Sequence, residues 1–129
     1  MIFFPTIFVN LHQHAVQIHF VRGMLSAHVE GNLNRKNHSE NNFSFNVKGG
    51  ERIIVNLVPL TKGLLLGGTV EYPNQTFDGE HGGLITNQIS SKSGTAFVTV
   101  NLNNMGTEKK TGRYIIEVIR FPRYITSVN

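Results

Sequence analysis

The sequence predicts an all-β domain, an antiparallel, jelly-roll-like β-sandwich of about eight strands, from three observations. Apolar and polar residues alternate with a period of two in many short stretches, which is the pattern of strands that bury one face. Gly and Asn interrupt these stretches at intervals of roughly 8–15 residues, as turns between strands do. No window of about ten residues combines an apolar helical stripe with a polar opposite face, so the pattern does not favour helices.

The first half of the chain contains four such stretches, separated by polar turns. The expected strands are residues 16–20, 25–30, 43–47 and 52–60. A polar loop, residues 35–42, separates the second from the third. Lys48–Glu51 follows the third and contains two glycines, which supply the positive φ that a tight hairpin turn requires. Pro59 has no N–H to donate, so it ends the fourth strand or places it at a sheet edge.

The second half continues the pattern with residues 64–72, 84–89, 96–102 and 114–119, and Pro122 breaks the chain before a final stretch at 124–128. Gly67 and Gly68 lie inside a strand, which indicates a bulge or a close approach of another segment. The longest turn-rich loop is residues 73–83. The residues expected in the core are Val29, Phe43, Phe45, Ile53, Val55, Leu57, Val98, Val100, Tyr114, Ile116 and Val118.

The chain divides into an N-terminal arm, residues 1–14, and one β-sandwich domain, residues 15–129. Met1–Val9 is apolar but short, and Pro5 interrupts it, so we expect an edge strand or an arm that packs on a neighbour. No Lys or Arg precedes this segment and no clear small-residue cleavage site follows it, so it is not a clear signal peptide. No stretch approaches the roughly 20 apolar residues of a transmembrane helix, and we expect none.

The composition argues against several function classes. The net charge is +4 and the pI is about 9.7, which would suit an acidic partner. The basic residues are nevertheless scattered, with adjacent pairs at Arg35–Lys36 and Lys109–Lys110, so we expect turn residues and no nucleic-acid partner. The sequence has no Cys, which excludes disulfides, thiol catalysis and Cys-zinc sites.

Catalytic motifs are missing as well. The chain has no G-x-S-x-G motif and no phosphate-binding glycine loop. A Ser-His-Asp triad would depend on Asp78, the single Asp of the sequence. We therefore expect no enzyme activity and no cofactor.

Three segments together resemble the bacterial pre-peptidase C-terminal domain. Phe43–Leu57 is similar to the family's aromatic strand, glycine turn and apolar strand, and Thr111–Val118 to its "GtYyi-V" strand. His19–Leu33 resembles its opening strand pair, and the likeness spans about Val16 to Val128. The resemblance implies a β-sandwich that serves secreted enzymes as an accessory module. It therefore implies a non-catalytic module, extracellular or at the cell surface, that binds polysaccharide or protein.

The residues that follow the fifth predicted strand are the best candidates for a ligand site. Aromatic and amide side chains could stack on and hydrogen-bond a sugar or a peptide, and the loop offers Tyr72, Asn74, Phe77, Asp78 and His81. The alternative is an exposed loop with one anchoring aromatic residue.

Two metal sites are weaker candidates. Glu71, Asp78 and Glu80 could offer oxygen ligands to calcium, but no calcium-loop pattern accompanies them. The acidic stretches that the resembled family often carries are also replaced here, which weakens the case for calcium. His12 and His14 lie two residues apart and would share one face of a strand, where both could bind a transition metal. The alternative for this pair is an exposed polar edge strand.

The apolar N-terminal segment suggests a second function. A sandwich with a detached apolar strand can donate it to the edge of a neighbouring copy. The alternative to a binding module is therefore a structural subunit of a larger assembly, with self-association through residues 1–10.

Overall fold

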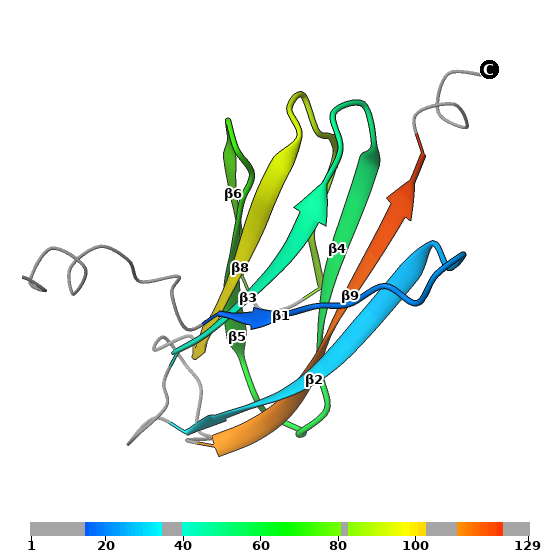
Figure 1. The fold of residues 1–129 in the computed structure, drawn as a ribbon. Helices are drawn as coiled ribbons and strands as arrows, with labels where there is room; N and C mark the ends of the chain where they lie inside the picture. The colour runs from blue at the N-terminus through cyan, green and yellow to red at the C-terminus, as the bar shows by residue number, and fades with distance from the viewer. Residues whose placement is uncertain (1–14, 35–39, 81–82, 103–110, 123–129) are drawn as a thin grey trace, which may run out of the picture.

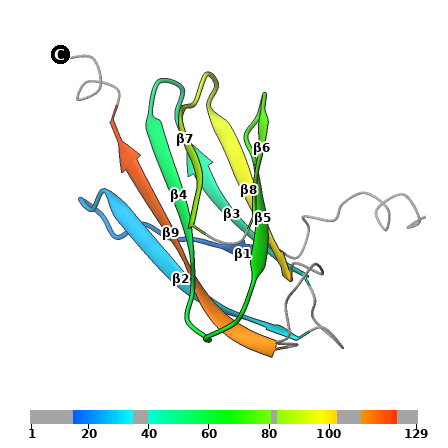
Figure 2. The ribbon, with the colours of Figure 1, turned by 180° about the vertical axis from the view of Figure 1, so that it is seen from behind.

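The computed structural model describes residues 15–34, 40–80, 83–102 and 111–122. All regular structure in these ranges is strand, and the described ranges contain no helix able to cross a membrane. The strands, labelled in Figures 1 and 2, are β1 Val16–Gln17, β2 Ser26–Asn34, β3 Glu40–Val47, β4 Arg52–Pro59, β5 Leu66–Glu71, β6 Thr76–Glu80, β7 Gly83–Ile89, β8 Gly94–Leu102 and β9 Thr111–Phe121.

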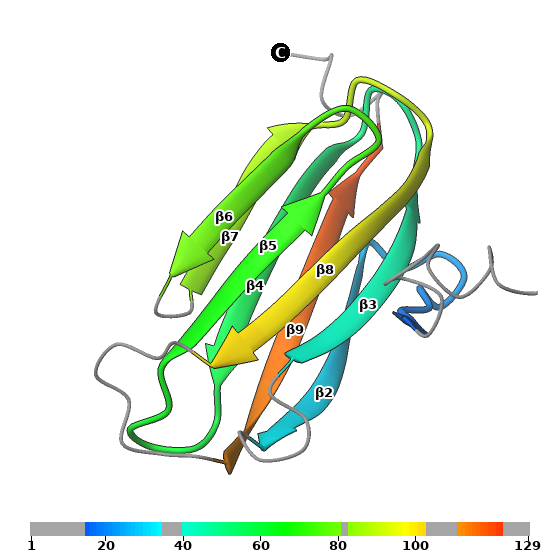
Figure 3. The same cartoon turned by 90° about the vertical axis from the view of Figure 1, so that its left-hand side faces the viewer.

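The strands form two sheets that pack face to face. One sheet has five strands in the order β1-β3-β8-β5-β6, and the other has four in the order β2-β9-β4-β7. All neighbours are antiparallel except β1, which runs parallel to β3. Figure 3 shows the five-stranded sheet in front of the other. From β2 to β9 the chain crosses from one sheet to the other at every connection except β5–β6, which is a hairpin within the five-stranded sheet. The predicted fold class, an antiparallel, jelly-roll-like β-sandwich, is confirmed.

The core lies between the two sheets and consists of the inward-facing residue of each alternating pair. Every residue predicted for it is buried except Val29, which is half-buried and packs against it. The rings of Phe43 and Tyr114 meet edge to face across the sheets, with centroids 6.3 Å apart. A side chain on Gly31 would clash with the Tyr114 ring, so β2 requires glycine at this position.

Asn41 links the two sheets at the open side of the sandwich. Its Nδ2 donates hydrogen bonds to the Tyr114 hydroxyl at 2.7 Å and to the carbonyl oxygen of Asn32 at 2.6 Å. Burial raises the pKa of Tyr114 to about 12, and the hydrogen bond from Asn41 opposes that shift.

Two predicted turns differ from expectation. Lys48–Glu51 is a tight turn with Gly50 at φ 92°, but it joins β3 of one sheet to β4 of the other instead of closing a hairpin. Residues 73–83 are not only loop, because Thr76–Glu80 pairs with β5 as an edge strand. Gly68 marks a close approach, as predicted, since an added Cβ would lie 2.7 Å from Ile85 Cδ1.

Several predictions fall outside the described residues. These are the apolar arm and its self-association (residues 1–14), the basic pairs Arg35–Lys36 and Lys109–Lys110, and a strand at 124–128. The division into an arm and a domain from residue 15 to 129 therefore stays a prediction.

Candidate binding surface

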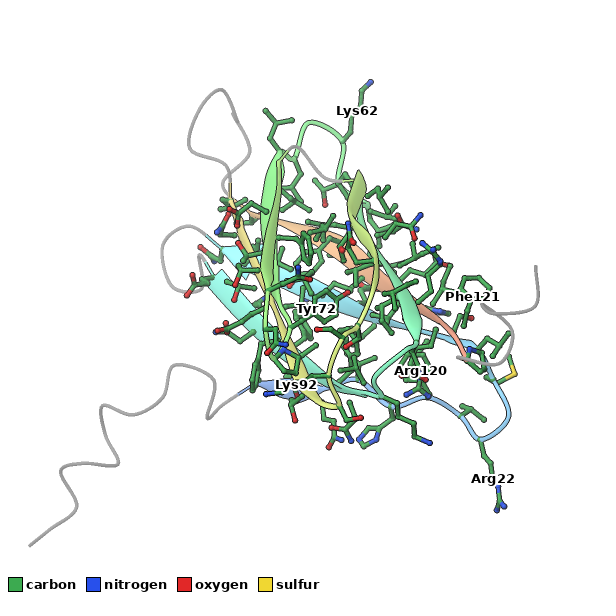
Figure 4. The ribbon with its side chains drawn as sticks, turned by 90° about the horizontal axis from the view of Figure 1, so that it is seen from above. Arg22, Lys62, Tyr72, Lys92, Arg120 and Phe121 are labelled. Carbon is green, nitrogen blue, oxygen red and sulfur yellow. The ribbon has the colours of Figure 1, made fainter. Side chains whose placement is uncertain are left out.

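The aromatic residues of the predicted ligand loop face the interior. Tyr72 is only 6% exposed, and its ring packs edge to face on Phe77 with centroids 5.8 Å apart. Phe77 is half-buried and packs against the core. Figure 4, which looks down on the sandwich, places Tyr72 within the fold. The expectation that Tyr72 offers its ring to a ligand is therefore wrong, and these aromatic residues anchor the β5–β6 hairpin.

The Tyr72 hydroxyl is buried without a hydrogen-bond partner among the described residues. Burial raises the pKa of Tyr72 to about 12, and the nearby Thr86 hydroxyl opposes the shift. The two hydroxyls do not meet at hydrogen-bonding geometry, and among the described buried side chains theirs are the polar atoms without a partner. Burying this unpaired hydroxyl costs free energy, and the packing of the Tyr72 ring compensates for that cost.

The polar residues of the loop are exposed but dispersed. Asn74 donates from Nδ2 to Ser91 Oγ at 3.1 Å, and Asp78 accepts a hydrogen bond from the Thr69 hydroxyl at 2.9 Å. Asp78 follows Phe77 on a strand, so the two side chains lie on opposite faces of the sheet. His81 lies outside the described residues. The structure thus brings Tyr72 and Phe77 into contact, whereas Asn74 and Asp78 bond to other residues. Ligand binding by Asn74, Phe77, Asp78 and His81 stays a prediction.

The metal candidates also stay predictions. Glu71 and Asp78 lie on β5 and β6, where Glu71 pairs with Thr76 and Asp78 with Thr69. The side chain of Glu80 and the whole of His12 and His14 lie outside what the structure describes. Within the described ranges no three His, Cys, Asp or Glu residues gather closely enough to hold a metal ion.

A turn that was not predicted from the sequence presents apolar side chains to solvent. Val21–Met24 is a β-turn in which the Met24 N–H donates to the Val21 carbonyl at 2.9 Å. Gly23 has φ 85°, the left-handed conformation that the third residue of a type II turn requires. Val21 is 72% exposed and Met24 56% exposed. Figure 4 shows Arg22, at the tip, projecting away from the fold.

Both ends of this turn are fixed to the sandwich. On one side Ile18 is buried, and its N–H donates to the Ser44 carbonyl at 2.7 Å. On the other side the Arg120 N–H donates to the Leu25 carbonyl at 2.7 Å. The turn is therefore held in one conformation before any partner arrives, which lowers the entropy lost on binding.

The turn leads into one end of the outer face of the four-stranded sheet, where several outward-facing side chains are apolar. Ile54 of β4 pairs with Ile119 of β9, and Arg52 lies between Phe121 and Ile89. The sheet register and burial pattern direct these residues away from the core, where antiparallel sandwiches usually carry polar side chains. We define the apolar surface as Val21, Met24, Ile54, Ile89, Ile119 and Phe121. Figure 2 shows that β2 starts and β9 ends at the same end of this sheet.

Several cations lie at the same end of the sandwich as the apolar surface. The turns at this end meet where the Gly49 N–H donates to Ser93 Oγ at 2.9 Å, which brings the segments of Lys48 and Lys92 together. Arg52 donates to Asn87 Oδ1 at 3.1 Å, and Glu51 is buried with its carboxylate accepting the Lys48 N–H. The exposed or half-buried cations described at this end are Arg22, Lys48, Arg52, Lys92 and Arg120.

The sequence contained a signal for this surface. Tyr114–Ile119 is apolar at all but one position, and Ile53–Val55 is apolar at every position. A strand with one solvated face should alternate, so apolar residues on both faces indicate that the outer face is also covered.

The sequence matches no family model, and no curated protein matches it. Solved structures do match. PliG of Salmonella Typhimurium, a periplasmic lysozyme inhibitor of g-type lysozyme, has a TM-score of 0.61 at 15% identity, over 83% of this chain and 97% of PliG. PliG of Aeromonas hydrophila has a TM-score of 0.60 at 14% identity, over 83% of this chain and 96% of that one.

A third structure carries the resemblance noted in the sequence. The pre-peptidase C-terminal domain of collagenase from Bacillus anthracis has a TM-score of 0.60 at 16% identity, over 84% of this chain and 98% of that domain. At such identities the likeness concerns the fold alone. The chain therefore has the β-sandwich fold of the pre-peptidase C-terminal domain, which the PliG inhibitors share.

Proposed function

We propose that this chain is a non-catalytic binding module that acts in the periplasm or outside the cell and whose partner is another protein. The observation that carries the proposal is the apolar surface, in which a rigid turn and the outer face of the four-stranded sheet present apolar side chains together. Contiguous exposed apolar areas on soluble domains commonly mark protein interfaces.

The chemistry of the surface suits a protein better than a polysaccharide. Sugars are bound by stacked aromatic rings and polar groups, whereas this surface is mainly aliphatic. Met24 adds a flexible, polarisable side chain that adapts to a partner's shape. The cations at the same end of the sandwich favour a partner whose facing surface is acidic, because charge complementarity speeds association and excludes wrong partners.

The structural neighbours support a binding role. The PliG structures are titled as periplasmic inhibitors of g-type lysozyme, and inhibitors of that kind act by binding a protein. The third neighbour is one domain of a collagenase. These neighbours, together with the missing catalytic motifs, favour a module without activity of its own and a location outside the cytoplasm.

Site-specific photocrosslinking tests the proposal. A photoreactive amino acid replaces Arg22 in one variant and Lys62, on the opposite side of the molecule in Figure 4, in a matched control. In extracts of the cells that produce the chain, we expect a crosslinked protein from position 22 only. Adding Met24→Ser should abolish that product. Equal crosslinking from both positions, or none from position 22, would refute the proposal.

Purified g-type lysozyme is the first defined protein to test, since it is the enzyme named for the PliG neighbours. Binding and inhibition of lysozyme that disappear in the Met24→Ser variant would identify the partner class. If binding persists in that variant, the apolar surface is not the interface.

A further inference from the structure

A small polar cavity that is widely open to solvent lies beside the Val21–Met24 turn. It has a volume of about 190 Å³ and lies between the β1–β2 connection and β3. Its lining comes from Gln17, Ile18, His19, Phe20, Asn46 and Arg120. The titratable groups among these are Arg120 and His19, so no carboxylate lines the cavity.

Arg120 is held in place while most of its donors stay available. Its guanidinium carbon lies 3.7 Å from the centre of the Phe20 ring, in a cation–π contact. One nitrogen, Nη1, donates to the Asn46 carbonyl at 3.3 Å. A guanidinium carries five N–H donors, and among the described residues no other acceptor is found for this side chain. The ring and the carbonyl therefore fix the group where Arg120 lines the cavity.

Arg113, on the same strand, is different. Its Nε donates to Glu30 Oε2 at 2.6 Å, and this hydrogen bond holds the pKa of Glu30 below its usual value. Arg113 thus has a carboxylate partner within the chain, whereas no carboxylate of the described residues pairs with the Arg120 guanidinium.

We propose that the cavity beside Arg120 binds a carboxylate, and that in function this carboxylate is an Asp or Glu side chain of the protein partner. The assignment of the carboxylate to a protein partner rests on the function proposed above, whereas the carboxylate site itself does not. Arg120 forms the paired N–H···O bonds for which a guanidinium fork is suited. His19 adds a further donor at the rim.

Size and position support a side-chain carboxylate. The volume is below the range of about 300–1,000 Å³ typical of sites for whole small molecules. The cavity adjoins the turn that presents Val21 and Met24, so a partner covering the apolar surface would place its own side chains over Arg120. Covering also excludes water, which strengthens the ion pair.

The first test uses the isolated protein and needs no partner. Glutarate and its neutral analogue glutaramide are titrated separately, and backbone amide and Arg120 Nε–H signals are followed by NMR. We expect glutarate, but not glutaramide, to shift the signals of Ile18, His19, Asn46 and Arg120. Equal shifts with both compounds, or none with glutarate, would overturn the carboxylate site.

Arginine variants locate the binding group. Arg120→Lys keeps the charge but loses the fork, and we expect it to weaken glutarate binding by about tenfold or more. Arg113→Lys and Arg22→Lys are matched controls that should bind as the wild type does. Unchanged binding by Arg120→Lys would refute the proposal, provided that its amide spectrum shows the native fold.

Two further ligands separate the possible sources of the carboxylate. An acidic peptide should bind more tightly than an oligogalacturonate of similar charge, and the reverse order would replace a protein partner by an acidic polysaccharide. Inorganic phosphate that binds more tightly than glutarate would reject a carboxylate site.

The two proposals can fail separately. If glutarate binds but no protein crosslinks at position 22, the carboxylate site is supported and the proposed function is refuted. If crosslinking succeeds without glutarate binding, only this inference fails.

Discussion

The β5–β6 hairpin and the Val21–Met24 turn use apolar residues in opposite ways. The hairpin carries Tyr72 and Phe77, the residues most suggestive of a ligand site, and turns them inward to hold an edge strand on the core. The turn carries ordinary aliphatic residues and turns them outward on a fixed backbone. The comparison teaches that residue type alone does not predict which residues are exposed. The proposed binding role of the turn rests on apolar side chains left exposed on an anchored backbone.

The largest effect is expected in the hairpin. Tyr72→Ala should lower the free energy of unfolding by about 3–5 kcal/mol, because it leaves a cavity under β6. Urea denaturation measures the loss. Tyr72→Phe is the control: it removes only the unpartnered hydroxyl and should leave stability unchanged or slightly higher. A midpoint for Tyr72→Ala equal to wild type would mean that the ring is not buried.

Alkaline pH should lower the stability that the buried tyrosines Tyr72 and Tyr114 contribute. Burial raises the pKa of Tyr72 and of Tyr114 from 10.0 to about 12, so the folded state favours the neutral phenols. Their contribution to stability is complete below pH 10 and is lost as the pH rises towards 12. Absorbance of phenolate and circular dichroism, followed together, should show ionisation coupled to unfolding in that window. The Tyr72→Phe variant should show a smaller loss, whereas ionisation near pH 10 without unfolding would contradict the burial.

A smaller effect is expected at the turn. Gly23→Ala meets no neighbouring atom but forces a side chain onto a residue with φ 85°, at a cost of about 1–2 kcal/mol. Thermal denaturation measures it, and Gly23→Asn is the control, since Asn tolerates this conformation better. An alanine variant as stable as wild type would show that the turn changes conformation freely, against the anchoring described above.

The smallest effect on stability should accompany the largest effect on binding. Val21→Ser combined with Met24→Ser should change the free energy of unfolding by no more than about 0.5 kcal/mol, because both side chains are exposed. The same double variant should lose the crosslink at position 22. A double variant that is strongly destabilised would mean that these residues serve the fold and not a partner.

The sequence predicted the core well because burial and period-2 alternation are both local properties. Phe45, Val55 and Ile116 could be assigned from their neighbours in the chain, and all three are buried. Strand partners are not local, and the Lys48–Glu51 turn therefore resembled a hairpin although it crosses between sheets.

The candidate site was less predictable for the same reason. From the sequence alone, Tyr72 and Phe77 could face the core or the solvent. Their orientation depends on the packing of β6 against the core, which is not a local property. Arg120 and Phe20 lie on separate segments, so no spacing in the sequence signals their contact. Ile54 and Ile119, on the outer face, did carry a signal, because they make their strand segments apolar on both faces. A search for period-2 alternation alone does not detect that signal.

The pairing of β2 with β9 has a consequence for biosynthesis. Ser26 pairs with Ile119 and Asn34 with Thr111, and β9 also provides the neighbour of β4. During translation the first strands of the four-stranded sheet must wait for nearly the entire domain before their central partner emerges. Such distant pairings make folding slow. Until β9 arrives, β2 has no partner within its sheet and β4 can pair with β7 alone, so this is the interval when a chaperone would be needed most.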